Sequence, residues 1–358
     1  MRQRLPDFPW DALAPYGAIA RKHPKGAIDL SVGTPVDPTP EFIQREFRNA
    51  SNAPSYPVTV GTPELRAAIT EWAKKVLGAT GDFAVLPLIG SKEFVAWLPT
   101  FIQAQSVLYP EVAYPTYLVG ALLAEAEATA VNRDAAAWPK ADMAWVNSPS
   151  NPTGRVHSEA ELRAAVAWSR KHKSIVVSDE CYLEFGDTAT PTSILQYTDG
   201  DNTNVLAVHS LSKRSSMAGY RAAFIVGDPL LIASILEVRK HAGMMVPLPV
   251  QKAMAIALSD DVHVAEQRNR YNARRAQLIP ALQKAGFTIQ DSQAGLYIWA
   301  TRQENCWDSV AWLAERGIIA TPGIFYGDLG ASHIRIALTA TDQQIAEAAT
   351  RIDEIATK

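Results

Sequence analysis

The sequence contains little cysteine, and this scarcity argues against two kinds of site. Its 358 residues include only two cysteines, Cys181 and Cys306. Two thiols are too few for a disulfide framework or for a zinc site built on cysteine. We expect both side chains to be packed rather than reactive, and this usage fits a reducing, cytoplasmic setting.

An excess of charge of one sign is also lacking. The 34 basic and 37 acidic side chains are mixed along the chain and leave a net charge of -3. A surface for nucleic acid would need a basic stripe, and none is present. No apolar run is long enough to span a membrane, and the N-terminal MRQRLPDFPW has no hydrophobic signal-peptide core. We therefore expect neither a nucleic acid nor a membrane as a partner.

The residues that are present have the balance of a globular protein, with 47% apolar and 20% charged side chains. A chain of this length usually forms two domains. Strand-like and helix-like stretches alternate in its middle, which predicts an α/β domain with a mainly parallel sheet. After about His263, a long polar helix followed by short strands and helices predicts a smaller α+β domain. We place an N-terminal segment at 1–34, a large domain at 35–262 and a small domain at 263–358.

Three helix starts are marked by capping residues. Ser158 and Glu161 form one capping-box pattern, and Thr341 and Gln344 form a second. Ser91 stands before apolar residues at helical spacing, so we expect it to be the N-cap of a third helix.

Four short apolar runs end in polar residues. They cover residues 83–89, 143–146, 174–177 and 204–208, and they lead into GSK, NSPSNPTG, SDECY and HSLSK. Ligands of open parallel sheets bind beyond the carboxyl ends of the strands. The sequence therefore predicts that these four segments line one site.

One group of these residues suits a phosphate monoester. A helix start offers backbone N–H groups and the positive end of its dipole, and hydroxyls and a guanidinium add further donors. The group consists of Gly90, Ser91, Lys92, Ser210, Ser212 and Arg221. A Gly-Ser pair alone is also typical of a plain turn.

The other residues suit a ring with a nitrogen, an oxygen and a carbonyl. Asp179 ends an apolar strand, where it either caps a helix or stabilises a protonated ring nitrogen. Tyr182 and Asn151 can donate to a ring oxygen, although packing and a plain turn are their alternatives. Lys213 provides an amine that can condense with a carbonyl. Combined with the phosphate group, these residues predict pyridoxal 5'-phosphate (PLP) as the cofactor and no metal.

These motifs resemble those of the class I/II aminotransferases, which are fold-type I PLP enzymes. The matching stretches are SLSK with Gly219 and Arg221 downstream, NPTG, DECY and GSKE. The resemblance covers nearly the whole chain. It implies a seven-stranded, mainly parallel sheet flanked by helices, a smaller α+β C-terminal domain, and Lys213, Asp179 and Tyr182 as catalytic residues.

The resemblance also implies roles for residues outside the four segments. Tyr114 would stack on the cofactor ring, and Tyr56 would reach the phosphate in the neighbouring subunit of a homodimer with shared sites. Arg335 would bind the substrate α-carboxylate together with Asn151. Gly33 would let the N-terminal segment, which we expect to pack on the small domain or on the partner subunit, approach the substrate.

Longer stretches, such as LIGSKEFVAWLPT and VHSLSKRSSMAGYRAAF, resemble the short-chain succinyldiaminopimelate aminotransferases. This implies amino transfer from N-succinyl-LL-2,6-diaminopimelate to 2-oxoglutarate in lysine and diaminopimelate biosynthesis. The distal carboxylate of that substrate needs a cation, although each candidate is also typical of a solvated surface charge. The candidates are Lys92, Arg239, Lys240, His241 and Arg214. The chain departs from the broad family within NSPSNPTG, where the asparagine that usually precedes Asn-Pro-x-Gly is replaced.

Three alternatives remain open on the same residues. The first is an aminotransferase for aspartate, aromatic amino acids or acetylornithine, and the second is a PLP-dependent β-lyase or decarboxylase. The third is a sensor domain that binds PLP without turnover. Such sensors carry a DNA-binding helix-turn-helix ahead of the PLP-binding part, and nothing of that kind precedes Asp7.

Overall fold

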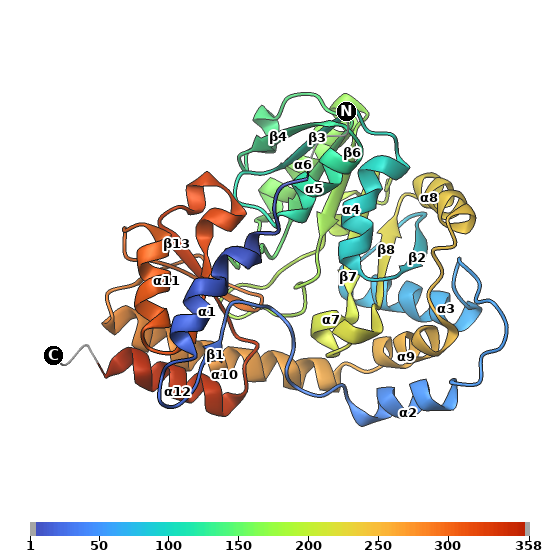
Figure 1. Ribbon diagram of the computed structural model, residues 1–358. Helices are drawn as coiled ribbons and strands as arrows, with labels where there is room; N and C mark the ends of the chain where they lie inside the picture. The colour runs from blue at the N-terminus through green and yellow to red at the C-terminus, as the bar shows by residue number, and fades with distance from the viewer. Residues whose placement is uncertain (1–4, 355–358) are drawn as a thin grey trace.

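The computed structural model describes residues 5–354 and contains a mixed seven-stranded sheet beside a smaller antiparallel one (Figure 1). In the large sheet, β8 is antiparallel to both of its neighbours, and every other pairing is parallel. The mainly parallel, seven-stranded sheet predicted from the sequence is therefore confirmed. Its strands, in spatial order, are β2 (Ala84–Leu88), β8 (Ala223–Gly227), β7 (Val205–Ser210), β6 (Ile175–Asp179), β5 (Met143–Asn147), β3 (Ser106–Pro110) and β4 (Glu127–Val131).

Helices cover both faces of this sheet because its strands are apolar on both sides. In β7, Val205 and Ala207 face one core while Leu206 and Val208 face the other, as the alternation of a strand requires. The first core includes residues of α2 (Glu41–Asn49), α3 (Pro63–Trp72), α6 (Glu159–His172) and α9 (Leu248–Leu258). The second includes residues of α4 (Ser91–Phe101), α5 (Thr116–Leu123) and α8 (Pro229–His241).

The small sheet follows the long helix α10 (Val262–Lys284), whose length Figure 1 shows along the base of the molecule. Its spatial order is β12-β13-β10-β9, and all its pairings are antiparallel. The smaller α+β part expected from the sequence is therefore present. It contains β9 (Thr288–Gln290), β10 (Tyr297–Thr301), α11 (Cys306–Ala314), β11 (Ile318–Ile319), β12 (Thr321–Pro322), β13 (His333–Ala337) and α12 (Asp342–Asp353).

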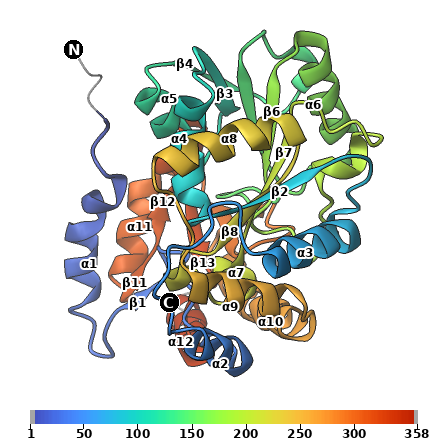
Figure 2. The ribbon, with the colours of Figure 1, turned by 90° about the vertical axis from the view of Figure 1, so that its right-hand side faces the viewer.

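The N-terminal segment lies along this C-terminal part. The helix α1 (Ala14–Ala20) is beside α11 in both ribbon views (Figures 1 and 2). The short strand β1 (Ile28–Asp29) pairs in parallel with β11. Beyond this pair, Leu30 forms backbone hydrogen bonds with Ile319 and Ala337, and the Gly33 carbonyl accepts one from Lys213, which follows β7 of the large sheet. Across residues 5–354, no helix has the length and apolar character needed to cross a membrane.

The helix starts agree with the capping patterns in two of three cases. Both capping boxes are formed, by Ser158 at α6 and by Thr341 at α12. The prediction that Ser91 is an N-cap is wrong, because Gly90 occupies the N-cap of α4 and Ser91 is its first residue. Gly90 has a φ of 87°, a backbone conformation that glycine adopts without strain.

Candidate active site

A cavity of about 470 Å³ lies at the carboxyl ends of β2, β5, β6 and β7. It brings together most of the residues selected from the sequence, from both sheets and from the N-terminal segment. Those lining it are Gly33, Ser91, Lys92, Tyr114, Asn151, Asp179, Tyr182, Ser210, Ser212, Lys213, Arg221 and Arg335. Tyr56 is not among them, and its side chain is 92% exposed on the surface of the chain.

At one end of the cavity, Arg221 lies against Gly90 at the start of α4. A Cβ atom at Gly90 would lie 2.1 Å from Nη2 of Arg221, so a side chain there would displace this guanidinium. The first turn of α4 carries N–H groups without intrahelical acceptors, and no side chain caps them. The Ser210 and Ser212 hydroxyl groups line the same cavity. These donors around a helix start suit a phosphate.

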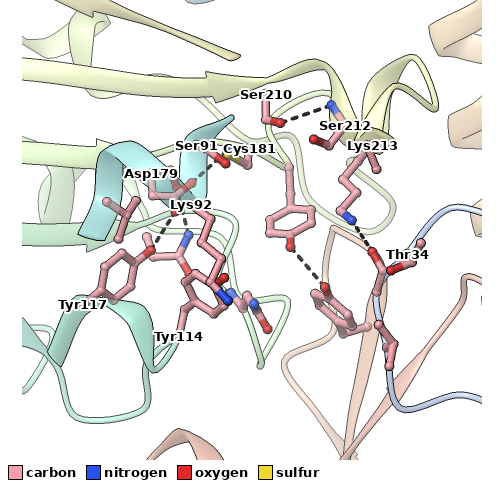
Figure 3. A pocket seen from close by; sticks show the side chains of 18 of the residues that line it. Thr34, Ser91, Lys92, Tyr114, Tyr117, Asp179, Cys181, Ser210, Ser212 and Lys213 are labelled. Carbon is pink, nitrogen blue, oxygen red and sulfur yellow. Dashed lines mark hydrogen bonds between the residues drawn. The ribbon is translucent and has the colours of Figure 1, made fainter. Parts of the chain in front are cut away.

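Asp179 holds its carboxylate in a buried position between two donors. Its Oδ2 accepts a hydrogen bond of 2.9 Å from the Tyr117 hydroxyl, and its Oδ1 accepts one of 3.2 Å from the Cys181 backbone N–H (Figure 3). Burial raises the pKa of Asp179. A cation facing this carboxylate, such as a protonated ring nitrogen, would offset the cost of burying its charge.

Tyr117 was missed by the sequence reasoning, although it follows Tyr114 by three residues. Its ring is fully buried and stacks on Trp145 with a centroid distance of 5.0 Å. Asn147 begins one of the predicted segments but was given no role of its own, and it connects two of these segments. Its Nδ2 donates to the Asp179 carbonyl at 2.9 Å, and its Oδ1 accepts from the Asn151 N–H at 2.7 Å.

The Lys213 amine points across the cavity toward the N-terminal segment that carries Thr34 (Figure 3) and donates a hydrogen bond to the Gly33 carbonyl. Burial lowers the pKa of Lys213 to about 8, and the positive charges of Arg335 and Arg221 act in the same direction. A substantial fraction of this amine is therefore neutral near physiological pH, which is the form that attacks a carbonyl.

Arg335 projects from β13 of the small sheet, lines the cavity and is only 2% exposed. It donates to Asn151 Oδ1 at 2.9 Å and to the Ser31 carbonyl at 2.6 Å, and its guanidinium carbon is 4.0 Å from the ring centre of Tyr297. All these partners are neutral. Among residues 5–354, no acidic side chain pairs with Arg335, so its buried charge is suited to a carboxylate from a ligand.

The two cysteines differ in position. Cys306 is buried in the core of the small sheet and its helices, as expected. Cys181 instead lines the cavity and is only partly buried. Burial and the neighbouring Asp179 raise its pKa well above the usual value, so it remains a thiol and not a reactive thiolate.

These features fit the cofactor expected from the sequence. The helix start at Gly90 suits its phosphate, and the buried carboxylate of Asp179 suits its ring nitrogen. Tyr182 keeps its proton because burial raises its pKa well above the usual value, so it can donate to the ring oxygen. Lys213 provides the neutral amine.

Four of the five candidate cations for a distal carboxylate are not in the cavity lining. Arg239, Arg214 and Lys240 form ion pairs with Glu93, Glu184 and Glu237, respectively. His241 is exposed near the end of α8. Only Lys92 lines the cavity, where its Nζ lies 5.7 Å from the ring centre of Phe8.

The pairing of Arg239 with Glu93 predicts a structural role. Both Glu93 oxygens accept from Nη1 of Arg239, at 3.0 and 3.1 Å, and Arg239 is fully buried. Arg239→Ala leaves Glu93 largely buried without its partner, so we expect a loss of about 3 kcal/mol in the free energy of unfolding, measured in urea.

Lys240→Ala is the matched control for this substitution, since Lys240 neighbours Arg239 and forms only an exposed pair with Glu237. Its expected loss is below about 1 kcal/mol. If Arg239→Ala is as stable as this control and instead weakens dicarboxylate binding, the structural role is wrong.

Comparisons with known proteins identify the family of the chain. The family model described as aminotransferase class I and II matches residues 25–352. A "probable aminotransferase" of Mycobacterium tuberculosis is 54% identical over 97% of this chain and 85% of its own length. The 4-dedimethylamino-4-oxo-anhydrotetracycline transaminase OxyQ of Streptomyces rimosus is 48% identical over 98% of this chain and 99% of its own. An LL-diaminopimelate aminotransferase of Dehalococcoides mccartyi is 34% identical over 91% of both chains.

Solved structures show the same fold. An aminotransferase from Staphylococcus aureus superposes with a TM-score of 0.88 at 26% identity, covering 99% of this chain and 98% of its own. A probable N-succinyldiaminopimelate aminotransferase from Thermus thermophilus gives 0.87 at 26% identity, covering 97% of this chain and 100% of its own. The chain belongs to the class I and II aminotransferases, and it is a transaminase whose cofactor is pyridoxal 5'-phosphate.

Proposed function

We propose that this aminotransferase moves the amino group of N-succinyl-LL-2,6-diaminopimelate to 2-oxoglutarate. The products are glutamate and N-succinyl-2-amino-6-oxopimelate, and the reaction is reversible. It would serve lysine and diaminopimelate biosynthesis in the cytoplasm. The observation that carries the proposal is that Arg335 and Lys92 line one cavity in addition to Lys213 and Arg221, and no acidic side chain among residues 5–354 pairs with either of them.

Both substrates need two cations because each carries a carboxylate at either end. Arg335 suits the α-carboxylate, since its guanidinium is buried among neutral partners and is held in place by Asn151. Lys92 suits the distal carboxylate, since it projects from the first turn of α4 beside Phe8 and no acidic side chain among residues 5–354 pairs with it. Lys92 lies next to the phosphate donors as well, so it can serve both groups.

The residues of the chain divide the work of amino transfer. Bound PLP supplies an electron sink for the bond that breaks at the substrate Cα. Asp179 keeps the ring nitrogen protonated, and Tyr182 donates to the ring oxygen. Lys213 would take the proton from the substrate Cα as a base and then give it up as an acid. Arg335 orients the substrate so that its Cα–H bond faces this amine.

We also propose that two copies of the chain share their sites. The exposure of Tyr56 supports this, because a tyrosine that is 92% exposed and outside its own cavity is accessible to another chain. Tyr56 would then donate to the phosphate bound by the partner subunit.

A second candidate substrate is a large ring-bearing ketone. Phe8 and Trp10 line the cavity beside Lys92, and such aromatic side chains suit a flat ring as well as an acyl chain. The relative from Streptomyces rimosus, at 48% identity, is named for a tetracycline-type substrate.

The deciding experiment is a substrate panel with 2-oxoglutarate as the acceptor. It compares succinyldiaminopimelate, LL-diaminopimelate, acetylornithine, aspartate and aromatic amino acids by glutamate formation. We expect the highest kcat/KM for succinyldiaminopimelate, and we expect Lys92→Ala to raise its KM by about tenfold, as for a lost charged hydrogen bond. Lys240→Ala serves as the control and should leave that KM unchanged.

A preference for aspartate or for aromatic amino acids would overturn the substrate assignment but not the reaction. In a separate assay with glutamate as the amino donor, faster amination of a polycyclic ketone than of 2-oxo acids would favour the second candidate. Release of pyruvate from cystathionine, without glutamate formation, would point to a lyase.

A further inference from the structure

Tyr297, the first residue of β10, lies where three parts of the site meet. Its hydroxyl oxygen is 3.1 Å from that of Tyr182, and its ring centre is 4.0 Å from the guanidinium carbon of Arg335. Its hydroxyl also faces Gly33, where an added Cβ would lie only 2.1 Å from it. Tyr297 itself is 3% exposed, so these contacts fix its position.

We propose that Tyr297 is a positioning residue that links the substrate-binding Arg335 to Tyr182, the donor to the cofactor oxygen, and that its hydroxyl group makes glycine necessary at position 33. This inference rests on the proposed roles of Tyr182 and Arg335 and extends them to a residue that neither the motifs nor the comparisons assign. It does not depend on which amino acid is the substrate.

The direction of the tyrosine pair follows from counting protons. Each phenol has one proton, and in the chain alone either hydroxyl can be the donor. Once Tyr182 donates to the ring oxygen of the cofactor, its proton is used, so Tyr297 must donate to Tyr182. A hydroxyl that accepts a hydrogen bond becomes a stronger donor. Tyr297 therefore strengthens the donation of Tyr182 to the cofactor.

The ring of Tyr297 has a separate effect on Arg335. An aromatic face attracts a guanidinium, and burial strengthens this attraction. The ring thus supports Arg335 from one side while Asn151 holds it from another.

The contact with Gly33 brings the N-terminal segment into the same network. The Gly33 carbonyl accepts a hydrogen bond from Lys213, so the segment touches both the reactive amine and Tyr297. A side chain at position 33 would push the Tyr297 hydroxyl away from Tyr182 or displace the segment from the site.

The test separates the hydroxyl from the ring with two variants of the PLP-bound enzyme. The absorbance of the bound cofactor changes with pH, and a weaker donor at the ring oxygen leaves more negative charge there and favours the protonated form. Tyr297→Phe should therefore raise the midpoint of this titration by about half a pH unit to one unit. Its KM for glutamate should change little, because the ring under Arg335 remains.

Tyr297→Leu removes the ring as well, and we expect it to raise the KM for glutamate by about tenfold in addition to shifting the midpoint. Gly33→Ala should impair the enzyme, and the double variant Gly33→Ala with Tyr297→Phe should recover part of the loss, because the nearest obstructing atom is gone. An unchanged midpoint in Tyr297→Phe overturns the inference, as does a double variant no better than Gly33→Ala alone.

These outcomes are distinct from a failure of the proposed function. The absorbance titration needs only bound cofactor, so it remains informative if succinyldiaminopimelate proves to be a poor substrate. Loss of the substrate assignment with a shifted midpoint would leave the role of Tyr297 intact. An active enzyme with an unshifted midpoint would remove that role alone.

Discussion

Replacing Lys213 by alanine should stop amino transfer, with kcat falling by on the order of 10²–10⁴-fold or more, the range for a positioned acid–base group. The structure gives the reason. Among the described residues, Lys213 and Lys92 are the only lysines that line the cavity. The Lys213 amine is held near the Gly33 carbonyl. Glutamate formation under saturating substrate measures the effect, and borohydride reduction of the PLP-bound wild type should attach the cofactor at Lys213.

The lowered pKa of Lys213 adds a pH-dependent check on the chain without cofactor. Its pKa of about 8 in the folded state lies below its ordinary value of 10.5, so the buried ammonium costs stability below about pH 8. That cost disappears as the pH rises from about 8 toward 10.5. Wild type should therefore gain stability relative to Lys213→Ala over this window. A constant difference between the two, or turnover by Lys213→Ala, would contradict the assignment.

Much of the site could be predicted because its residues sit at the ends of short apolar runs. Asp179 and Ser210 each close a buried strand, and the strands before them are readable from their apolar residues alone. Parallel strands bring their carboxyl ends to one edge of the sheet. The segments that follow these strands could therefore be predicted to line one site. The helix starts at Ser158 and Thr341 were equally readable, since a capping box is a local pattern.

Contacts between distant parts of the chain could not be read in this way. Tyr117 and Tyr297 stand within apolar stretches, where a tyrosine is typical of packing, and only the fold brings each hydroxyl to a partner. The prediction that Ser91 is the N-cap of α4 was wrong for the same reason. Gly90 takes that position with a positive φ, and a side chain there would displace Arg221, which follows it by more than one hundred residues in the sequence.

The candidate cations illustrate the same difficulty. Arg239 and Lys92 are equally plausible in sequence, yet Arg239 is paired with Glu93, 146 residues away, while Lys92 is left facing the cavity. A charge pattern along the chain does not reveal which ion pairs form. The division of the chain at residues 34 and 262, and the contact of Tyr56 with a partner, stay predictions.

The substitution Asp179→Asn should give the second large effect, a fall in kcat on the order of 10²–10³-fold, as for the loss of one preorganised electrostatic group. Asparagine keeps the shape of the site. Its oxygen can accept from the Cys181 N–H, and its amide can donate to the Tyr117 hydroxyl, which rotates to accept. Only the negative charge is lost, which we propose keeps the ring nitrogen protonated, so the fall in kcat isolates that charge.

The free energy of unfolding of Asp179→Asn provides a control, because we expect this substitution to raise stability while it lowers kcat. Burial raises the folded-state pKa of Asp179 above its ordinary value of 3.8, so its charge costs stability once the pH exceeds that value, and the cost reaches its full size above the folded-state pKa. Asp179→Asn should therefore stabilise the cofactor-free chain at pH 7, whereas Asp199→Asn at an exposed site should not. With PLP bound, the cation facing Asp179 offsets the cost, and the gain should shrink or reverse. A buried carboxylate that serves a cationic ligand destabilises the folded chain as long as that ligand is absent. If Asp179→Asn were instead less stable than wild type without cofactor, Asp179 would have a structural role.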